Sequence, residues 1–136
     1  MTKKICLVLG GGGSKGLAHV GVIKALCEKG YEITQIAGTS AGALVGGLYA
    51  ANPNYESLEK IVETLSYLEL LKIFVEWPLK SGLLRGRKSE MYLDKMCQGK
   101  NIEELPIKFK AVCSDLVEGK KFVFKEGKLA TAIQAS

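Results

Sequence analysis

Histidine is the scarcest of the chemically versatile residues in this 136-residue chain, with His19 as the only one. The four cysteines contain no CxxC pair. Because zinc sites need clusters of these two residue types, we expect no metal site. Cys6 and Cys113 fall in apolar, strand-like runs, where thiols usually act as small buried hydrophobes. We therefore expect reduced thiols and a cytosolic setting.

A concentrated charge and a long apolar run are also missing. The net charge of +5 is spread along the chain, and no basic tail or stripe indicates nucleic-acid binding. The apolar run 5–9 is too short for a signal peptide. The uncharged stretch 33–55 contains too many glycine and polar residues for a membrane-spanning helix. The length and the 47% apolar content suit one domain with a real core.

What is present alternates between strand-like and helix-like segments joined by short loops. The run 4–9 is typical of a strand buried on both faces, and glycines end it. Such an alternation predicts an α/β fold with a mostly parallel sheet. The expected elements are strands 4–9, 33–37, 108–113 and 121–125, with helices 14–29 (capped by Ser14), 40–51, 55–75 (one or two helices), 89–98 and 129–136.

The strongest local motif is Gly38-Thr39-Ser40-Ala41-Gly42, which matches G-x-S-x-G between an expected strand and an expected helix. This context is what a nucleophile elbow requires, with the serine on a sharp turn above the sheet edge. The following helix would direct its free N–H groups at the site, where they favour an oxyanion. In the alternative, Gly38 and Gly42 only permit close packing of a buried turn.

A second glycine-rich loop, Gly10 to Gly16, also lies between a strand and a helix. Gly11, Gly13 and Gly16 satisfy the dinucleotide pattern G-x-G-x-x-G, but the next strand ends without the acidic residue that holds a ribose. A P-loop does not fit, because Ser14 precedes Lys15. The third use is an oxyanion hole built from bare backbone amides. Loops after neighbouring parallel strands meet at one sheet edge, which favours this third use, with nucleotide binding as the alternative.

A base that could activate Ser40 is hard to find. His19 precedes the serine, against the order Ser, acid, His of α/β-hydrolases, so a structural role is favoured. The chain has two aspartates. Asp94 is expected as a surface charge on an amphipathic helix. Asp115 stands at the end of a strand, where it either approaches the site or caps the following turn, and the cap is favoured.

Together these residues resemble the patatin-like phospholipases. The resemblance rests on Gly11 to Gly16 with the following Leu17 to Val22, on Gly38 to Gly42, and on the segments 111–116 and 132–136. It implies a three-layer α/β/α fold over residues 1–136. It further implies a lipid acyl hydrolase with Ser40 as nucleophile, an oxyanion hole of Gly11, Gly12 and Gly13, and supporting roles for Lys15, Gly16, Gly38 and Gly42.

The resemblance also implies a Ser-Asp dyad that needs no cofactor. The family aspartate stands in an Asp-Gly-Gly or Asp-Gly-Ala motif, which this sequence does not contain, and Asp115 matches a non-catalytic position. We therefore expect the amino-terminal part of a longer enzyme, a poor catalyst alone or a non-catalytic lipid-binding remnant. A lipid ester is the implied substrate and a membrane surface an allowed partner. Helices 55–75 and the basic loop 80–88 either cover the site and meet lipid, or form a packed helix pair and a solvated loop.

Overall fold

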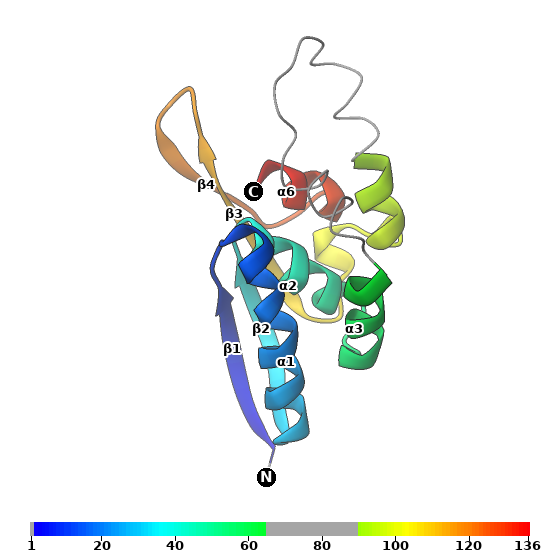
Figure 1. Cartoon of the computed structure of the whole chain (residues 1–136). Helices are drawn as coiled ribbons and strands as arrows, with labels where there is room; N and C mark the ends of the chain where they lie inside the picture. Colours follow the sequence, from blue (N-terminus) through cyan, green and yellow to red (C-terminus); the bar gives the residue numbers. More distant parts are fainter. Residues whose placement is uncertain (1, 65–89) are drawn as a thin grey trace.

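The computed structural model describes residues 2–64 and 90–136 (Figure 1). The elements at the amino end are β1 (Lys3–Leu9), the 3₁₀ helix η1 (Gly13–Leu17), α1 (Ala18–Glu28), β2 (Tyr31–Gly38), α2 (Ala41–Ala51) and α3 (Tyr55–Thr64). Residues 90–96 are helical, and then follow η2 (Ile102–Glu104), β3 (Lys108–Asp115), β4 (Lys120–Phe124) and α6 (Leu129–Ala135). The part of the expected helical segment 55–75 that follows Thr64, and the expected loop 80–88, lie outside the described residues.

The four strands form one sheet in the order β1-β2-β3-β4. β1, β2 and β3 run parallel, and β4 returns antiparallel to β3. This confirms the mostly parallel α/β sheet. β2 is longer than the predicted 33–37, because its pairing with β1 already begins at Lys3 opposite Tyr31.

Helix α1 begins later than predicted. The expected Ser14 cap is wrong, because the chain first forms the 3₁₀ helix η1, which starts after Gly12 without a side-chain cap. Gly12 and Gly13 both adopt positive φ (156° and 55°), so the glycine loop makes a tight turn before the α-helix can start. Gly30, at φ 77°, ends α1 as predicted.

The core lies on one face of the sheet. Leu9, Ile36 and Phe109 point toward α2, and every residue of α2 is buried. α1 packs on β2, and α6 packs on α2 and β3, so the described helices meet the same face (Figure 1). On the opposite face Val8 is 81% exposed. Burial of the first strand on both faces is therefore a wrong expectation within the described residues.

The cysteines follow from this one-sided arrangement. Cys6 points to the uncovered face and is exposed, and Cys113 is half-buried, so the expectation that both are buried is wrong. Cys97, which follows helix 90–96, is the buried thiol. Burial, and secondarily the charge of Asp94, raises the pKa of Cys97 to about 12. All four cysteines are free thiols.

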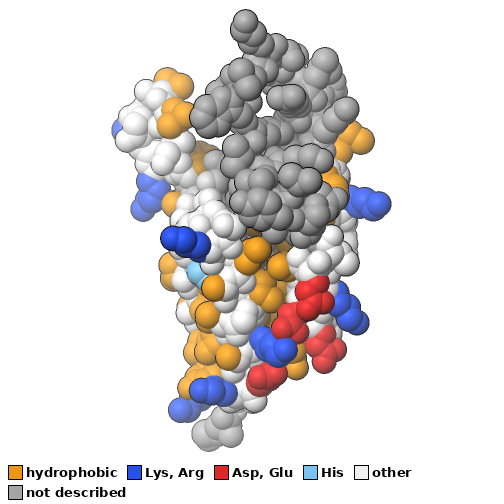
Figure 2. Space-filling view, viewed as in Figure 1, with side chains coloured by type: hydrophobic (Ala, Val, Ile, Leu, Met, Phe, Trp, Pro, Cys, Tyr) orange, Lys and Arg blue, Asp and Glu red, His pale blue; other side chains and the backbone are white. Residues whose placement is uncertain are grey.

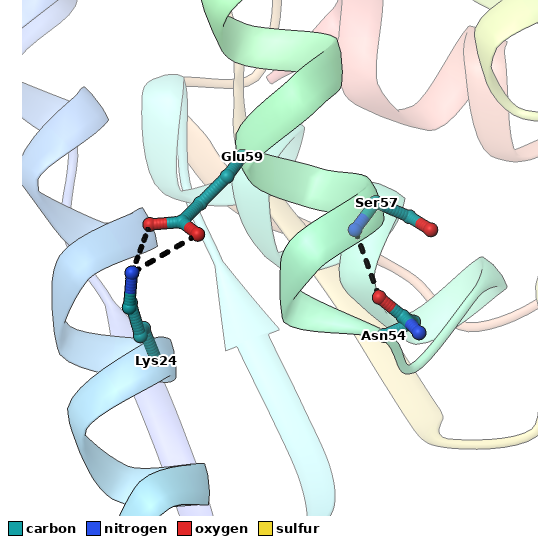
Figure 3. A network of polar contacts seen from close by, with 4 residues as sticks. All are labelled: Lys24, Asn54, Ser57 and Glu59. Atoms are coloured by element: carbon teal, nitrogen blue, oxygen red, sulfur yellow. Dashed lines mark hydrogen bonds and ion pairs between the residues drawn. The ribbon is translucent and has the colours of Figure 1, made fainter.

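Helix α3 is attached to α1 by polar contacts (Figure 3). The Ser57 N–H donates to Asn54 Oδ1 at 2.8 Å, which caps the start of α3. Lys24 Nζ on α1 donates to Glu59 Oε1 on α3 at 3.0 Å, and this hydrogen bond raises the pKa of Lys24. Leu58 fills the apolar side of the contact and is 2% exposed. The helix predicted from residue 55 is thus confirmed as far as Thr64.

Replacing Ile23, which is fully buried on α1, tests the placement of this core. We expect Ile23→Ala to lower the free energy of unfolding by about 2–5 kcal/mol, because it removes packed methyl groups and leaves a cavity. The matched control is the adjacent Val22→Ala, which is 45% exposed and should stay within about 0.5 kcal/mol of wild type. Denaturant unfolding measures both, and equal losses would contradict the fold.

The thiols give a second test. Only the thiolate is nucleophilic, and the raised pKa keeps Cys97 protonated as the pH rises through the range where an ordinary thiol ionises. In the folded chain we expect iodoacetamide to alkylate Cys6 rapidly at mildly alkaline pH, and Cys97 only after unfolding. Peptide mass mapping over time measures this, and equal rates for the two thiols in the folded chain would contradict it.

Candidate active site

Ser40 occupies the turn between β2 and α2. Its φ of 52° and ψ of −123° place a non-glycine residue in a backbone region that L-residues rarely adopt. Such strain costs about 1–3 kcal/mol and persists only where the surrounding structure enforces it. Strand, sharp turn and helix follow one another as a nucleophile elbow requires.

Gly38 and Gly42 make this turn possible. A Cβ atom on Gly38 would overlap the carbonyl group of Gly42, and a Cβ atom on Gly42 would overlap the carbonyl oxygen of Leu9. These are backbone atoms that cannot swing aside. The two glycines of the motif are therefore required by contact across the turn and with the end of β1.

The glycine loop lies against the elbow. A Cβ atom on Gly11 would stand 3.2 Å from Ser40 Cβ and 3.8 Å from its Oγ. Gly16 leaves no room for a side chain, because its Cβ would overlap that of Ala41 at the start of α2. The parallel strands thus bring the two loops to one sheet edge, as the sequence predicted.

Backbone donors near Ser40 are available. Within the described residues, no hydrogen bond engages the N–H groups of Gly11, Gly12 or Ala41. The amino end of α2 adds its partial positive charge. Lys15 lies on η1, three residues after Gly12, with an exposed side chain.

Two hydroxyl groups, those of Thr39 and Ser136, hold the turn at Ser40 in place through hydrogen bonds. The Ser40 N–H donates to Ser136 Oγ at 2.9 Å, and Ser136 Oγ donates to the Val112 carbonyl at 2.5 Å. Thr39 Oγ1 donates to the same carbonyl at 3.0 Å. Sequence reasoning did not foresee this role of Thr39 and Ser136, since their hydrogen bonds join residues that are up to 96 positions apart. The only available signal was the resemblance of the segments that hold them.

His19 and Asp115 have structural contacts, as favoured from the sequence, and Asp94, which was expected as a surface charge, lies beside Lys128. His19 Nε2 donates to the Gly10 carbonyl at 2.9 Å and so supports the glycine loop. Asp115 Oδ1 accepts from the N–H groups of Val117 and Glu118, at 2.9 and 3.1 Å. Asp94 lies 3.6 Å from Lys128 Nζ. None of the three is a hydrogen-bond partner of Ser40 in the described part of the chain.

The described residues show no group of three His, Cys, Asp or Glu side chains placed to hold a metal ion. Among residues 2–64 and 90–136, no helix has both the length and the apolar character needed to cross a membrane. Among the residues that the structure describes, the candidate site consists of the Ser40 hydroxyl group, backbone amides and the amino end of α2.

A family model described as "Patatin-like phospholipase" matches residues 7–136. The chain belongs to the patatin-like phospholipase family. It is 39% identical to an uncharacterized NTE family protein of Mycobacterium tuberculosis over 98% of its own length and 37% of that protein. It is 33% identical to the human patatin-like phospholipase domain-containing protein 6 over 97% of its length and 10% of that protein. The chain thus spans 37% of the mycobacterial relative and 10% of the human one.

The patatin-like elbow can be tested through its glycines. Helix propensity alone predicts that Gly→Ala stabilises both Gly42 in α2 and Gly21 in α1, by about 0.5–1 kcal/mol. Gly21 has open space around it, so Gly21→Ala should do so. At Gly42 the new methyl group would overlap Leu9, and we expect Gly42→Ala to destabilise by about 1–3 kcal/mol or more. Denaturant unfolding checks the opposite signs, and stabilisation by both variants would contradict the packing.

Proposed function

We propose that this chain supplies the nucleophile and the oxyanion hole of a lipid acyl hydrolase. The observation that carries the proposal is the positive φ of Ser40 beside Gly11, within a family named for phospholipases. The strained backbone at Ser40 lowers stability. A nucleophilic role explains why the strain is retained, because the serine hydroxyl group must then stand free of the sheet edge. A carboxylic ester of a lipid is the substrate class that fits this site and this family.

In the proposed reaction Ser40 Oγ attacks the ester carbonyl carbon while its proton passes to a carboxylate base. The carbonyl oxygen becomes an oxyanion, held by the N–H groups of the loop Gly11 to Gly13 and of Ala41. Each such donor is typically worth about 10²–10³ in rate. Collapse of the tetrahedral intermediate expels the alcohol, which takes up the proton, and water then hydrolyses the acyl-enzyme. No metal or organic cofactor enters these steps.

We infer that the base of the proposed Ser-Asp dyad is neither Asp94, which lies 3.6 Å from Lys128, nor Asp115, which accepts N–H groups within the β3–β4 turn. We infer that it comes from sequence outside this chain, in keeping with the share of the relatives that the chain spans. Lys15 and the glycines around the elbow are proposed in supporting roles, and His19 as the support of the glycine loop. The chain alone is then expected to hydrolyse esters slowly.

A fluorophosphonate probe tests the proposal without requiring full turnover. We expect one adduct per folded chain by intact mass, since the probe needs a serine hydroxyl group that it can reach and an oxyanion hole. Ser40→Ala should abolish the adduct. Ser57→Ala, which alters another half-buried serine at the start of α3, should retain it.

Circular dichroism establishes that each variant is folded. A persistent adduct in Ser40→Ala would remove Ser40 as the nucleophile. No adduct in the folded wild-type chain would contradict an assembled oxyanion hole.

A further inference from the structure

The peptide group between Thr39 and Ser40 determines the unusual backbone angle of the serine. Rotation of this rigid plane changes ψ of Thr39 and φ of Ser40 together. The observed φ of 52° therefore requires that the plane keep one orientation. Without support the plane would turn, because a residue with a Cβ atom favours negative φ. Whatever holds this peptide group consequently holds the Ser40 side chain in its place.

Hydrogen bonds engage both ends of this peptide group. The Thr39 carbonyl accepts the Gly42 N–H at 2.9 Å, and the Ser40 N–H donates to Ser136 Oγ at 2.9 Å. The bond from Gly42 lies within the turn and can move with it. The bond to Ser136 joins residues that are 96 positions apart. Ser136 therefore ties this peptide group to a distant part of the protein.

The Ser136 hydroxyl group is itself fixed by its surroundings. Ser136 directly follows α6, which packs on α2 and β3 and buries Leu129 and Ile133. Its N–H donates to the Ile133 carbonyl at 3.2 Å, and its hydroxyl group donates to the Val112 carbonyl. Because a hydroxyl group has one hydrogen atom and two lone pairs, donation to Val112 leaves a lone pair for the Ser40 N–H. The packing of α6 and the position of β3 thus place this acceptor independently of the turn.

The bond to Ser136 also decides which N–H groups of the turn remain available. The N–H groups of Thr39 and Gly42 donate to backbone carbonyls, and that of Ser40 donates to Ser136. Within residues 2–64 and 90–136, no hydrogen bond engages the Ala41 N–H. The turn therefore offers a bound substrate the amide of Ala41, at the start of α2.

Small rotations at this turn would move the serine side chain relative to the glycine loop. A Cβ atom on Gly11 would stand 3.2 Å from Ser40 Cβ and 3.8 Å from its Oγ. A displacement of about 1 Å at a reacting group can cost about 10²-fold in rate. A return of Ser40 to negative φ would thus separate its hydroxyl group from the amides that are proposed to hold the oxyanion.

We propose that Ser136 is a positioning residue for the nucleophile. Its hydroxyl group holds the Thr39–Ser40 peptide group in the orientation that gives Ser40 its positive φ. The effect on reactivity rests on the proposed function, and the effect on backbone conformation is independent of it. Ser136 acts on Ser40 from α6, a helix outside the two loops that form the candidate site.

The Ser136 hydroxyl group acts through geometry and not through charge. It is neutral and accepts the backbone N–H of Ser40, so it takes no proton from the nucleophile. The acidic side chains visible in Figure 2 gather over α1 and α3. Removal of the Ser136 hydroxyl group should therefore slow the reaction of Ser40 without changing the shape of its pH profile.

The kinetics of fluorophosphonate labelling test this effect on reactivity. A series of probe concentrations separates the maximal labelling rate, kinact, from the binding constant of the probe, KI. We expect Ser136→Ala to lower kinact about tenfold or more and to leave KI unchanged, because the nucleophile is misplaced and not lost. Thr131→Val is the matched control, since it removes a hydroxyl group of α6 that donates to Glu90, and it should label like wild type.

Thr39→Val separates the two hydroxyl groups that share the Val112 carbonyl. It removes the bond from Thr39 Oγ1 to that carbonyl and keeps the acceptor of the Ser40 N–H. We expect a smaller fall in kinact than in Ser136→Ala. Equal falls in these two variants, or an unchanged kinact in Ser136→Ala, would overturn the role of Ser136.

Nuclear magnetic resonance tests the conformation without any labelling. In wild type we expect the Ser40 amide to be protected from hydrogen exchange. In Ser136→Ala this exchange should accelerate, and the Cα and Cβ chemical shifts of Ser40 should move, since they report its backbone angles. Thr131→Val should change neither. Unchanged exchange and shifts in Ser136→Ala would overturn the inference whatever the labelling shows.

The two measurements separate this inference from the proposed function. Absence of labelling in folded wild type would refute the assembled hydrolase site, and the spectra of Ser136→Ala would then decide the conformational role. Circular dichroism establishes that each variant is folded. If Ser136→Ala does not fold, the wild-type spectrum still decides, because an unprotected Ser40 amide would contradict the bond to Ser136.

Discussion

The site depends on the close approach of the β2–α2 turn to the end of β1. Thr39 N–H donates to the Leu9 carbonyl at 3.1 Å, and a Cβ atom on Gly42 would overlap the same oxygen. That contact holds Ser40 at a positive φ that an unsupported chain would leave. If the turn moved away by the width of one methyl group, the serine could relax and its hydroxyl would lose its defined position.

The apolar burial of α2 stabilises the position of the turn. All eleven of its residues are buried, and small residues bring it close to the sheet. A Cβ atom on Gly46 would stand 2.8 Å from Ile36 Cγ2, and one on Gly47 would stand 2.9 Å from Ile133 Cδ1. Apolar burial of this extent stabilises the helix by far more than the strain at one serine costs. The backbone distortion at Ser40 is thus local, and the packing of α2 against the sheet compensates for its cost.

The second loop and the hairpin are arranged by the same parallel topology. Parallel strands end at one edge, so the glycine loop after β1, the elbow after β2 and the hairpin after β3 all lie there. The Val112 carbonyl links elbow and hairpin through Thr39 and Ser136. One sheet edge thereby brings the glycine loop, the proposed reactive serine and the base of the hairpin together.

Much of this arrangement was determined by sequence. Apolar runs, glycines and their spacing predicted the order of strands and helices, the G-x-S-x-G turn and the meeting of the two loops, since these depend on near neighbours and on strand direction. Other features depend on contacts between distant segments. The exposure of Cys6, the late start of α1 and the bond from Ser40 to Ser136 were decided only by the tertiary structure, because a residue's burial and its partners depend on what packs against it.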